Sequence, residues 1–150
     1  MTKPIKILTA LPPPQRARLM ELAEEVYFPE DTRIFDSGGT ADRFWVIRSG
    51  AVSLDQELSD VQRVTVAGLG AGDLLGWSWL FPPYEWDFGA EAFSPVRAYE
   101  FDAATVLRLC EDDTALGLAL VRCVAEVLAH RLETTRGQLM HQYATRGGVP

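Results

Sequence analysis

The densest group of side chains that could do chemistry lies between Gly76 and Ala90, where six aromatic residues fall within twelve positions. Rings of this kind can stack on a flat or apolar ligand, with a polar group such as Ser78 to orient it. The same rings can also pack on one another and close the space. No lysine or arginine occurs between Gly76 and Pro95, so the stretch offers no cation to an anionic ligand. The aromatic residues are Trp77, Trp79, Phe81, Tyr84, Trp86 and Phe88.

Catalytic and metal-binding patterns do not appear in the sequence. It contains no nucleophile elbow, phosphate-binding loop, zinc-protease motif or EF-hand loop. His130 and His141 are eleven residues apart, which places them about 16 Å apart along a helix, too far to share one metal ion. We therefore expect a non-enzymatic protein with no metal and no cofactor.

Composition and charge indicate one globular domain over residues 1–150. Hydrophobic residues make up 47% and charged residues 23% of the chain, and no apolar run approaches the roughly 20 residues of a membrane span. Five basic and thirteen acidic residues between 29 and 102 would repel nucleic acid. Cys110 and Cys123 lie in apolar helical sequence and are expected to be buried free thiols. These features predict a cytoplasmic protein that binds neither nucleic acid nor membrane.

The centre of the chain, residues 25–101, has the pattern of a β-roll. Short runs of β-branched and aromatic residues alternate with glycine and aspartate, which predicts a barrel or a double sheet. The fold class is therefore mainly β with flanking helices, a double-stranded β-helix or jelly-roll-like β-roll. The expected strands are Glu25–Phe28, Thr32–Phe35, Phe44–Ser49, Ala51–Gln56, Gln62–Leu69, Gly89–Ala92 and Val96–Phe101, with a hairpin tip at Glu57–Asp60.

Three helices are expected to flank the roll. A short one over residues 14–25 follows Pro12–Pro14, carries apolar residues at helical spacing, and ends before Pro29. A second, over residues 103–111, is capped by Asp102. The third is long, covers residues 114–143, and has Asp112 or Asp113 as its cap.

The long helix carries a heptad seam. Seven residues recur at spacings of 3, 4, 3, 4, 3 and 4, a pattern typical of a two-stranded coiled coil. The stripe could instead pack on its own β-roll, and a threonine and an alanine weaken it. We expect a homodimer through this helix. The seam residues are Leu118, Val121, Ala125, Leu128, Leu132, Thr135 and Leu139.

Two glycine-containing stretches resemble the cyclic-nucleotide-binding domains of the catabolite-activator superfamily. The first is Phe35-Asp36-Ser37-Gly38 followed by Ala41-Asp42-Arg43-Phe44-Trp45-Val46-Ile47-Arg48-Ser49-Gly50, and the second is Leu69-Gly70-Ala71-Gly72-Asp73-Leu74-Leu75-Gly76. The resemblance covers roughly residues 11–143 in the same element order. Gly50 and Gly72 are expected in turns with positive φ.

The resemblance implies a phosphate-binding cassette directly after Gly76, and the sequence departs from the family pattern there. The family has a glutamate that holds a ribose hydroxyl and an arginine that pairs with the cyclic phosphate. Trp77 stands at the glutamate position, and Asp87 or Phe88 stands at the arginine position. Losing the arginine contact alone weakens binding by about 10–100-fold. The candidate ligand-binding residues are Gly76, Trp77, Ser78, Trp79, Asp87, Phe88, Gly89, Ala90, Arg131 and Thr135.

Arg131 and Thr135 enter that set because the stretch Leu128–Thr135 resembles the dimer helix of the family, where a threonine reaches the nucleotide base across the subunit boundary. The alternative is that both are ordinary seam or surface residues. Only eleven residues follow Leu139, so no DNA-binding winged helix is expected. The leading hypothesis is a regulatory module that senses a cyclic nucleotide or an apolar aromatic compound and signals to an unknown protein partner. A ligand-free dimeric scaffold and a cyclic-nucleotide binder with altered contacts are the alternatives.

Overall fold

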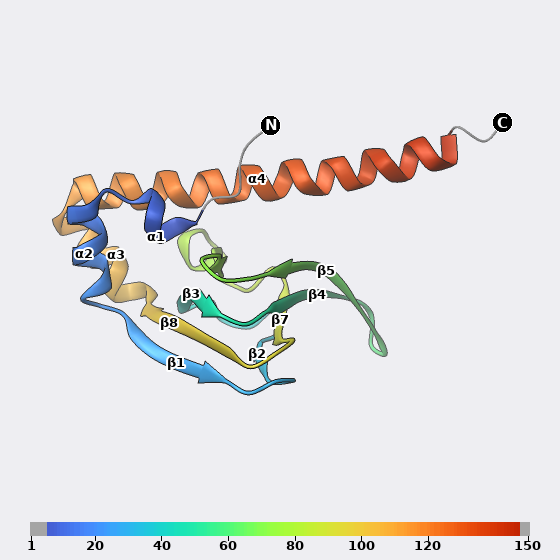
Figure 1. Ribbon diagram of the computed structural model, residues 1–150, viewed down its shortest axis with the longest axis horizontal. Coiled ribbons are helices and arrows are strands. Elements are labelled where there is room, and N and C mark those ends of the chain that lie inside the picture. The colour runs from blue at the N-terminus through green and yellow to red at the C-terminus, as the bar shows by residue number, and fades with distance from the viewer. Residues whose placement is uncertain (1–5, 148–150) are drawn as a thin grey trace.

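The computed structural model describes residues 6–147, which form two four-stranded antiparallel sheets with helices at one end (Figure 1). The strands of each sheet pair in an order that differs from their order in the chain, as in a roll. This arrangement confirms the predicted fold class. The first sheet has the order β1 (Glu24–Phe28), β8 (Val96–Asp102), β3 (Arg43–Ser49) and β6 (Leu74–Leu75); the second has the order β2 (Arg33–Phe35), β7 (Gly89–Ala92), β4 (Val52–Ser59) and β5 (Gln62–Leu69).

The helices frame the roll on one side. Figure 1 shows α4 running above the strands and projecting past them at its C-terminal end, with the other helices gathered near its start. No helix within residues 6–147 is both long and apolar enough to cross a membrane. The helices are α1 (Ile7–Ala10), α2 (Pro13–Met20), α3 (Ala103–Asp112) and α4 (Thr114–Gly147), with a single 3-10 turn, η1 (Ser78–Leu80), after β6.

Aspartate caps start both C-terminal helices. The Asp102 carboxylate accepts hydrogen bonds from the backbone N–H of Thr105 at 3.0 Å and from its hydroxyl at 2.7 Å. Asp113 accepts from the backbone N–H of Leu116 at 3.1 Å. Such caps satisfy N–H groups that have no partner inside the helix. The predicted cap of α3 is confirmed, and Asp113 caps α4.

The core joins the first sheet to α4 through stacked rings and aliphatic side chains. Phe44 stacks on Trp79 at 4.5 Å and on Phe101 at 4.9 Å, measured between ring centroids. All three side chains are almost completely buried. The face of α4 that meets this core consists of Leu116, Leu120, Cys123, Val124 and Val127, each buried.

Gly50 shows why glycine is needed at a turn of this roll. Its φ is +92°, a region that other L-residues rarely occupy. A Cβ atom there would lie 2.1 Å from the backbone oxygen of Pro95, which cannot move aside as a side chain could. Gly50 and Gly72 both have the positive φ that the sequence predicts.

The predicted helix over residues 14–25 is wrong at its C-terminal end. The helix α2 stops at Met20, and Glu24 and Glu25 belong to β1, where they pair with Glu100 and Tyr99 of β8. The helical spacing persists through Val26, but pairing with β8 stabilises an extended backbone there. Local periodicity is a weak preference that a tertiary partner overrides.

Smaller elements and boundaries also differ from expectation. The one-turn helix α1 and the two-residue strand β6 carry too few residues to show a period. The hairpin strands continue to Ser59 and restart at Gln62, so the tip is Asp60-Val61 rather than Glu57–Asp60. Helix α4 runs to Gly147, beyond the expected Tyr143; the rest of the predicted C-terminal tail, residues 148–150, lies outside the described residues.

Candidate functional site

The segment from Gly76 to Phe88 leaves β6, makes the turn η1 and returns to β7. Three backbone hydrogen bonds, each of 2.8 Å, hold the second half of this segment to the loop before β3. The N–H of Gly38 donates to the Trp86 carbonyl, and the N–H of Trp86 donates to the Gly39 carbonyl. The N–H of Ala41 donates to the Tyr84 carbonyl. These bonds fix the path of the segment independently of any ligand.

The six aromatic residues of this segment separate into a buried pair and a more exposed set. Trp79 joins the core stack, and its indole N–H donates to the Gly76 carbonyl at 3.1 Å. Trp86 stacks on Phe35 with 4.0 Å between ring centroids. Both indoles are at most 6% exposed. Two of the three indoles of the segment are therefore already used in packing. Trp77 and Phe88 are half-buried, and Phe81 and Tyr84 are exposed.

Gly76 makes room for this packing. Its φ is +94°, and a Cβ atom would lie 2.8 Å from the Trp86 ring. A side chain at position 76 would therefore displace the indole as well as strain the backbone. Gly76 resembles the first residue of the family's cassette. In this structure its missing side chain leaves the space that the Trp86 ring occupies.

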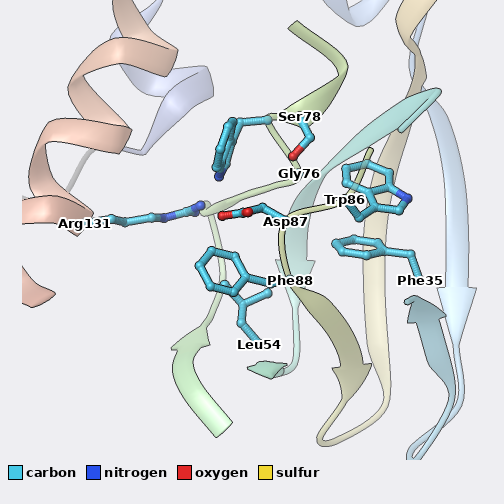
Figure 2. A pocket seen from close by; sticks show the side chains of 9 residues that line it. Phe35, Leu54, Gly76, Ser78, Trp86, Asp87, Phe88 and Arg131 are labelled. Carbon is cyan, nitrogen blue, oxygen red and sulfur yellow. The ribbon is translucent and has the colours of Figure 1, made fainter. Parts of the chain in front are cut away.

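A small cavity remains between the segment, the second sheet and α4 (Figure 2). Its volume, measured as the space open to the centre of a water molecule, is only about 20 Å³. That is room for about one ordered water molecule. Small-molecule pockets are typically about 300–1,000 Å³. This conformation therefore has no space for a nucleotide. The lining residues are Phe35, Leu54, Gly76, Trp77, Ser78, Trp86, Asp87, Phe88 and Arg131.

Arg131 brings a positive charge to the cavity from α4. Figure 2 shows its side chain reaching from the helix toward Asp87, which points into the same space. The guanidinium donates a hydrogen bond to the Leu74 carbonyl. Burial lowers the pKa of Arg131, and the Asp73 carboxylate acts in the opposite direction. No carboxylate in the described part of the chain lies within ion-pair distance of this guanidinium. It is therefore a half-buried cation that shares the cavity lining with an acid.

The position of Arg131 follows from the buried face of α4. Leu116, Leu120, Val124 and Val127 pack on the domain, and Arg131 comes four residues later on the same stripe. At that point along the helix the core gives way to the cavity. The spacing of this stripe is a signal in the sequence that would have assigned Arg131 to the domain-facing side.

The structure brings together six of the predicted ligand-binding residues around the cavity and leaves four elsewhere. Gly76, Trp77, Ser78, Asp87, Phe88 and Arg131 line it. Trp79 is in the core, and Ala90 is completely buried in β7. Thr135 is exposed, and its hydroxyl donates to the Arg131 carbonyl at 2.9 Å within the helix.

Gly89, the remaining member of the set, lies against an ion pair between two other residues of the second sheet. Arg33 and Asp55 meet above it with 2.5 Å between Nη1 and Oδ2. A Cβ atom on Gly89 would lie 2.2 Å from the Arg33 guanidinium and 2.5 Å from the Asp55 carboxylate. The hydrogen bond to Asp55 raises the pKa of Arg33. This pair ties β2 to β4 across β7.

Comparison with known proteins decides the family. The family model "Cyclic nucleotide-binding domain" matches residues 25–113, more than half of the chain. This chain belongs to the cyclic nucleotide-binding domain family. A CRP-like cAMP-activated global transcriptional regulator of Mycobacterium tuberculosis is 27% identical over 133 residues, which is 89% of this chain and 58% of that protein. The chain therefore spans less than two thirds of the length of this curated relative.

Solved structures agree with the family assignment. A putative cyclic nucleotide-binding protein from Geobacter metallireducens is 28% identical with a TM-score of 0.74, over 88% of this chain and 99% of that one. A cyclic nucleotide-binding domain from Methylobacillus flagellatus has a TM-score of 0.83 at 15% identity, over 92% of this chain and 81% of that one. The second likeness shows the fold alone.

Three residues that line the cavity of this cyclic nucleotide-binding domain were not among the predicted ligand-binding residues. Phe35 and Leu54 lie on strands of the second sheet, and Trp86 was assigned only to the aromatic cluster. Alternation along the strands places Phe35 and Leu54 inward, but every inward residue of a roll shares that pattern. Which of them meets a cavity depends on packing between segments distant in the chain.

The heptad seam of this domain lies away from the roll. Leu118, Val121, Leu132 and Leu139 are between 44% and 66% exposed. Ala125 and Thr135 are also exposed, and Leu128 is half-buried. Helix α4 therefore has one apolar face packed on the domain and a second that nothing in the described chain covers.

Proposed function

We propose that this domain is a non-enzymatic regulatory module, in which the cassette no longer holds a cyclic nucleotide by its phosphate and α4 carries the output through a homodimer. The observation that carries the proposal is the arrangement of charges at the cavity. The acid Asp87 points into it, and its cation comes from Arg131 of α4 (Figure 2).

The cassette argues against tight cyclic nucleotide binding on three counts. Its own segment has no cation, and a bidentate arginine–phosphate contact is the strongest single polar contact available. Asp87 lines the cavity, and its carboxylate would repel a phosphate placed there. The indole of Trp86 and the ring of Phe35 stack tightly beside the remaining space. Arg131 offsets only part of this loss, because it is already bonded to the Leu74 carbonyl.

Arg131 gives the cavity a direct connection to α4. Whatever changes the charge or volume of the cavity must change the environment of a buried guanidinium on that helix. The seam lies one residue further along, at Leu132. A change at the cavity can therefore alter how α4 presents its exposed apolar face to a second copy or to a protein partner.

The deciding experiment is calorimetric titration of the protein with cyclic AMP, cyclic GMP and flat apolar heterocycles. We expect no cyclic nucleotide binding at micromolar concentration, because the missing arginine alone weakens binding by about 10–100-fold. A Kd near or below about 1 μM for either cyclic nucleotide would contradict the proposal. Binding of a heterocycle that is lost in Trp77→Ala would identify the ligand class of the sensor.

The second candidate function is a ligand-free dimeric scaffold. It is favoured by the small cavity, which is about the size of one water molecule. The two functions differ in their response to ligands. A protein that dimerises and shows no thermal shift with any compound is a scaffold. A sensor changes its melting temperature or its dimer affinity with at least one ligand. In either case we propose a cytoplasmic protein that does not bind nucleic acid or membrane.

A further inference from the structure

The first sheet carries a group of arginine–tyrosine pairs that shares no residue with the cassette cavity. In the ladder, Tyr27 lies opposite Arg97, and Glu25 lies opposite Tyr99. The Arg97 guanidinium carbon is 5.3 Å from the centroid of the Tyr27 ring, and that of Arg48 on β3 is 5.1 Å from the Tyr99 ring. Of these residues, Glu25, Tyr27, Arg48 and Arg97 line a groove. Its volume, measured as the space open to the centre of a water molecule, is about 180 Å³, against about 20 Å³ for the cassette cavity.

The groove is open because the helices cover only one end of this sheet face. Phe101, Tyr99 and Arg97 alternate along β8 and so point to the same face. Phe101 lies in the helix-covered core and is fully buried, whereas Tyr99 is half-buried and Arg97 is exposed. Tyr27 on the neighbouring strand is 52% exposed. The exposed end of the face thus presents arginine and tyrosine where the covered end presents apolar rings.

Arg97 differs from the other arginines between residues 29 and 102. Each of the other four forms an ion pair with at least one carboxylate; these are Arg33, Arg43, Arg48 and Arg63. Arg97 has no carboxylate within 4.0 Å anywhere in residues 6–147, although residues 29–102 alone hold thirteen acids. A guanidinium stacked on a ring is oriented and still has its planar donors available for a carboxylate.

The strand beside the groove is also free along one side. Strand β1 is at the end of its sheet and pairs only with β8 among the described strands. Figure 1 shows it at the outer edge of the molecule. An unpaired strand edge can accept an extended peptide through backbone hydrogen bonds, while side-chain contacts beside it give specificity.

We propose that this groove is a docking site for an extended acidic segment of a partner protein, which pairs with the edge of β1 and places a carboxylate on Arg97. Charge complementarity selects this occupant, since the one unpaired guanidinium of the region is held ready for a bidentate contact. A nucleic acid has no amide backbone that could pair with the edge of β1. The proposal is independent of what the cassette binds.

The test uses three synthetic probes of about ten residues: a peptide in which glutamate alternates with threonine, the same peptide with glutamine in place of glutamate, and a single-stranded RNA. Binding is followed by NMR chemical shifts of the 150-residue chain. We expect the glutamate peptide to shift resonances of β1, β8 and the Arg97 side chain, and the glutamine peptide to bind at least roughly tenfold more weakly. Raising the salt concentration should weaken the binding further.

Variants at exposed positions separate this site from nonspecific attraction. Arg97→Gln should weaken binding of the glutamate peptide roughly tenfold, and Arg97→Lys should weaken it less. The matched control is Arg63→Gln, an arginine 45% exposed on the other sheet, which should bind as the wild type does. The proposal fails if Arg97→Gln binds like Arg63→Gln, if the shifts lie outside β1 and β8, if no acidic peptide binds at millimolar concentration, or if the RNA binds more tightly than the peptide.

Discussion

At the scale of single residues, the cavity is lined by opposite charges from two segments. The segment after β6 supplies an acid, Asp87, and α4 supplies a cation, Arg131. A guanidinium removed from water without a carboxylate partner is costly. Arg131 lies where α4 meets the cavity. This position supports the proposed role of Arg131 in linking the cavity to the helix.

Gly50 is the residue whose replacement should cost the most stability for the smallest change. Gly50→Ala forces a positive φ on alanine and brings its Cβ against the Pro95 backbone. We expect the free energy of unfolding to fall by at least about 2 kcal/mol, measured by urea denaturation. Gly70→Ala is the control, because a Cβ atom there meets nothing within 4 Å; equal losses in the two variants would contradict the argument.

The Asp102 cap gives stability a defined dependence on pH. Hydrogen bonds from the Thr105 hydroxyl and backbone N–H lower the pKa of Asp102 below its usual 3.8. A lowered folded-state pKa means that the cap stabilises the protein above that usual value and is lost as the pH falls through the lowered pKa. By analogy with other helix caps, Asp102→Ala should cost about 1 kcal/mol at pH 7.

The difference between wild type and Asp102→Ala should therefore shrink below pH 3.8. Chemical denaturation from pH 7 down to the acid limit of folding measures it. Asp112→Ala is the control, because it removes a carboxylate from the exposed far end of the same helix without touching the cap. A constant difference at all pH values would show that the Asp102 carboxylate does not act as a charged cap.

At the scale of elements, helix α4 has two apolar faces with different surroundings. One face packs on the domain through buried aliphatic residues and ends at Arg131, and the other presents the exposed heptad seam. A helix apolar on two sides is poorly suited to a monomer in water, because exposed leucine stripes associate. The sequence period alone could not tell these faces apart, since both repeat at helical spacing.

Leu132 offers the cleanest test of the proposed dimer. Leu132→Asp places like charges opposite each other at the centre of a coiled-coil seam and should weaken dimerisation by at least roughly tenfold. Light scattering across concentration measures it. Met140→Asp, off the seam and 62% exposed against 66% for Leu132, should leave the dimer intact. A wild-type protein that is monomeric at high micromolar concentration, or a Leu132→Asp dimer of unchanged affinity, would rule out the seam as the interface.

At the scale of the whole molecule, the roll and its function separate. The fold matches that of solved relatives, while the segment between Gly76 and Pro95 carries no cation. A fold tolerates such change because its stability rests on the core, and the ligand site lies where the roll meets α4. Membership of the family therefore predicts the architecture of this chain more firmly than its ligand.

Restoring a cassette cation should test whether chemistry or space limits nucleotide binding. In Asp87→Arg the repulsive acid becomes a phosphate partner, and affinity for cyclic AMP should rise at least roughly tenfold over wild type. Asp87→Ser is the control that removes the acid without adding a cation. Calorimetry on the three proteins measures the change. Undetectable binding in all three would show that the packed aromatic rings, more than the missing charge, close the site.

Much of the fold could be predicted because its determinants are local. The Asp102 cap, the positive-φ turns at Gly50 and Gly72, and the alternation along most strands depend on a residue and its near neighbours in the chain. The heptad spacing of α4 is equally local. The predicted C-terminal end of the first helix is wrong, because Glu24 and Glu25 pair with β8, whose residues lie more than seventy positions away in the chain.

Only the tertiary structure decided which residues line the cavity beside the cassette. The sequence identified the aromatic rings and the absence of a cation between Gly76 and Pro95. It did not reveal that Trp79 and Trp86 pack into the core, or that Arg131 reaches the cavity from α4. Likewise, it did not reveal Arg97 as the arginine without a carboxylate partner. Each of these outcomes is a contact between segments distant in the chain. Residue type determined which interactions were possible, and packing in three dimensions selected which of them formed.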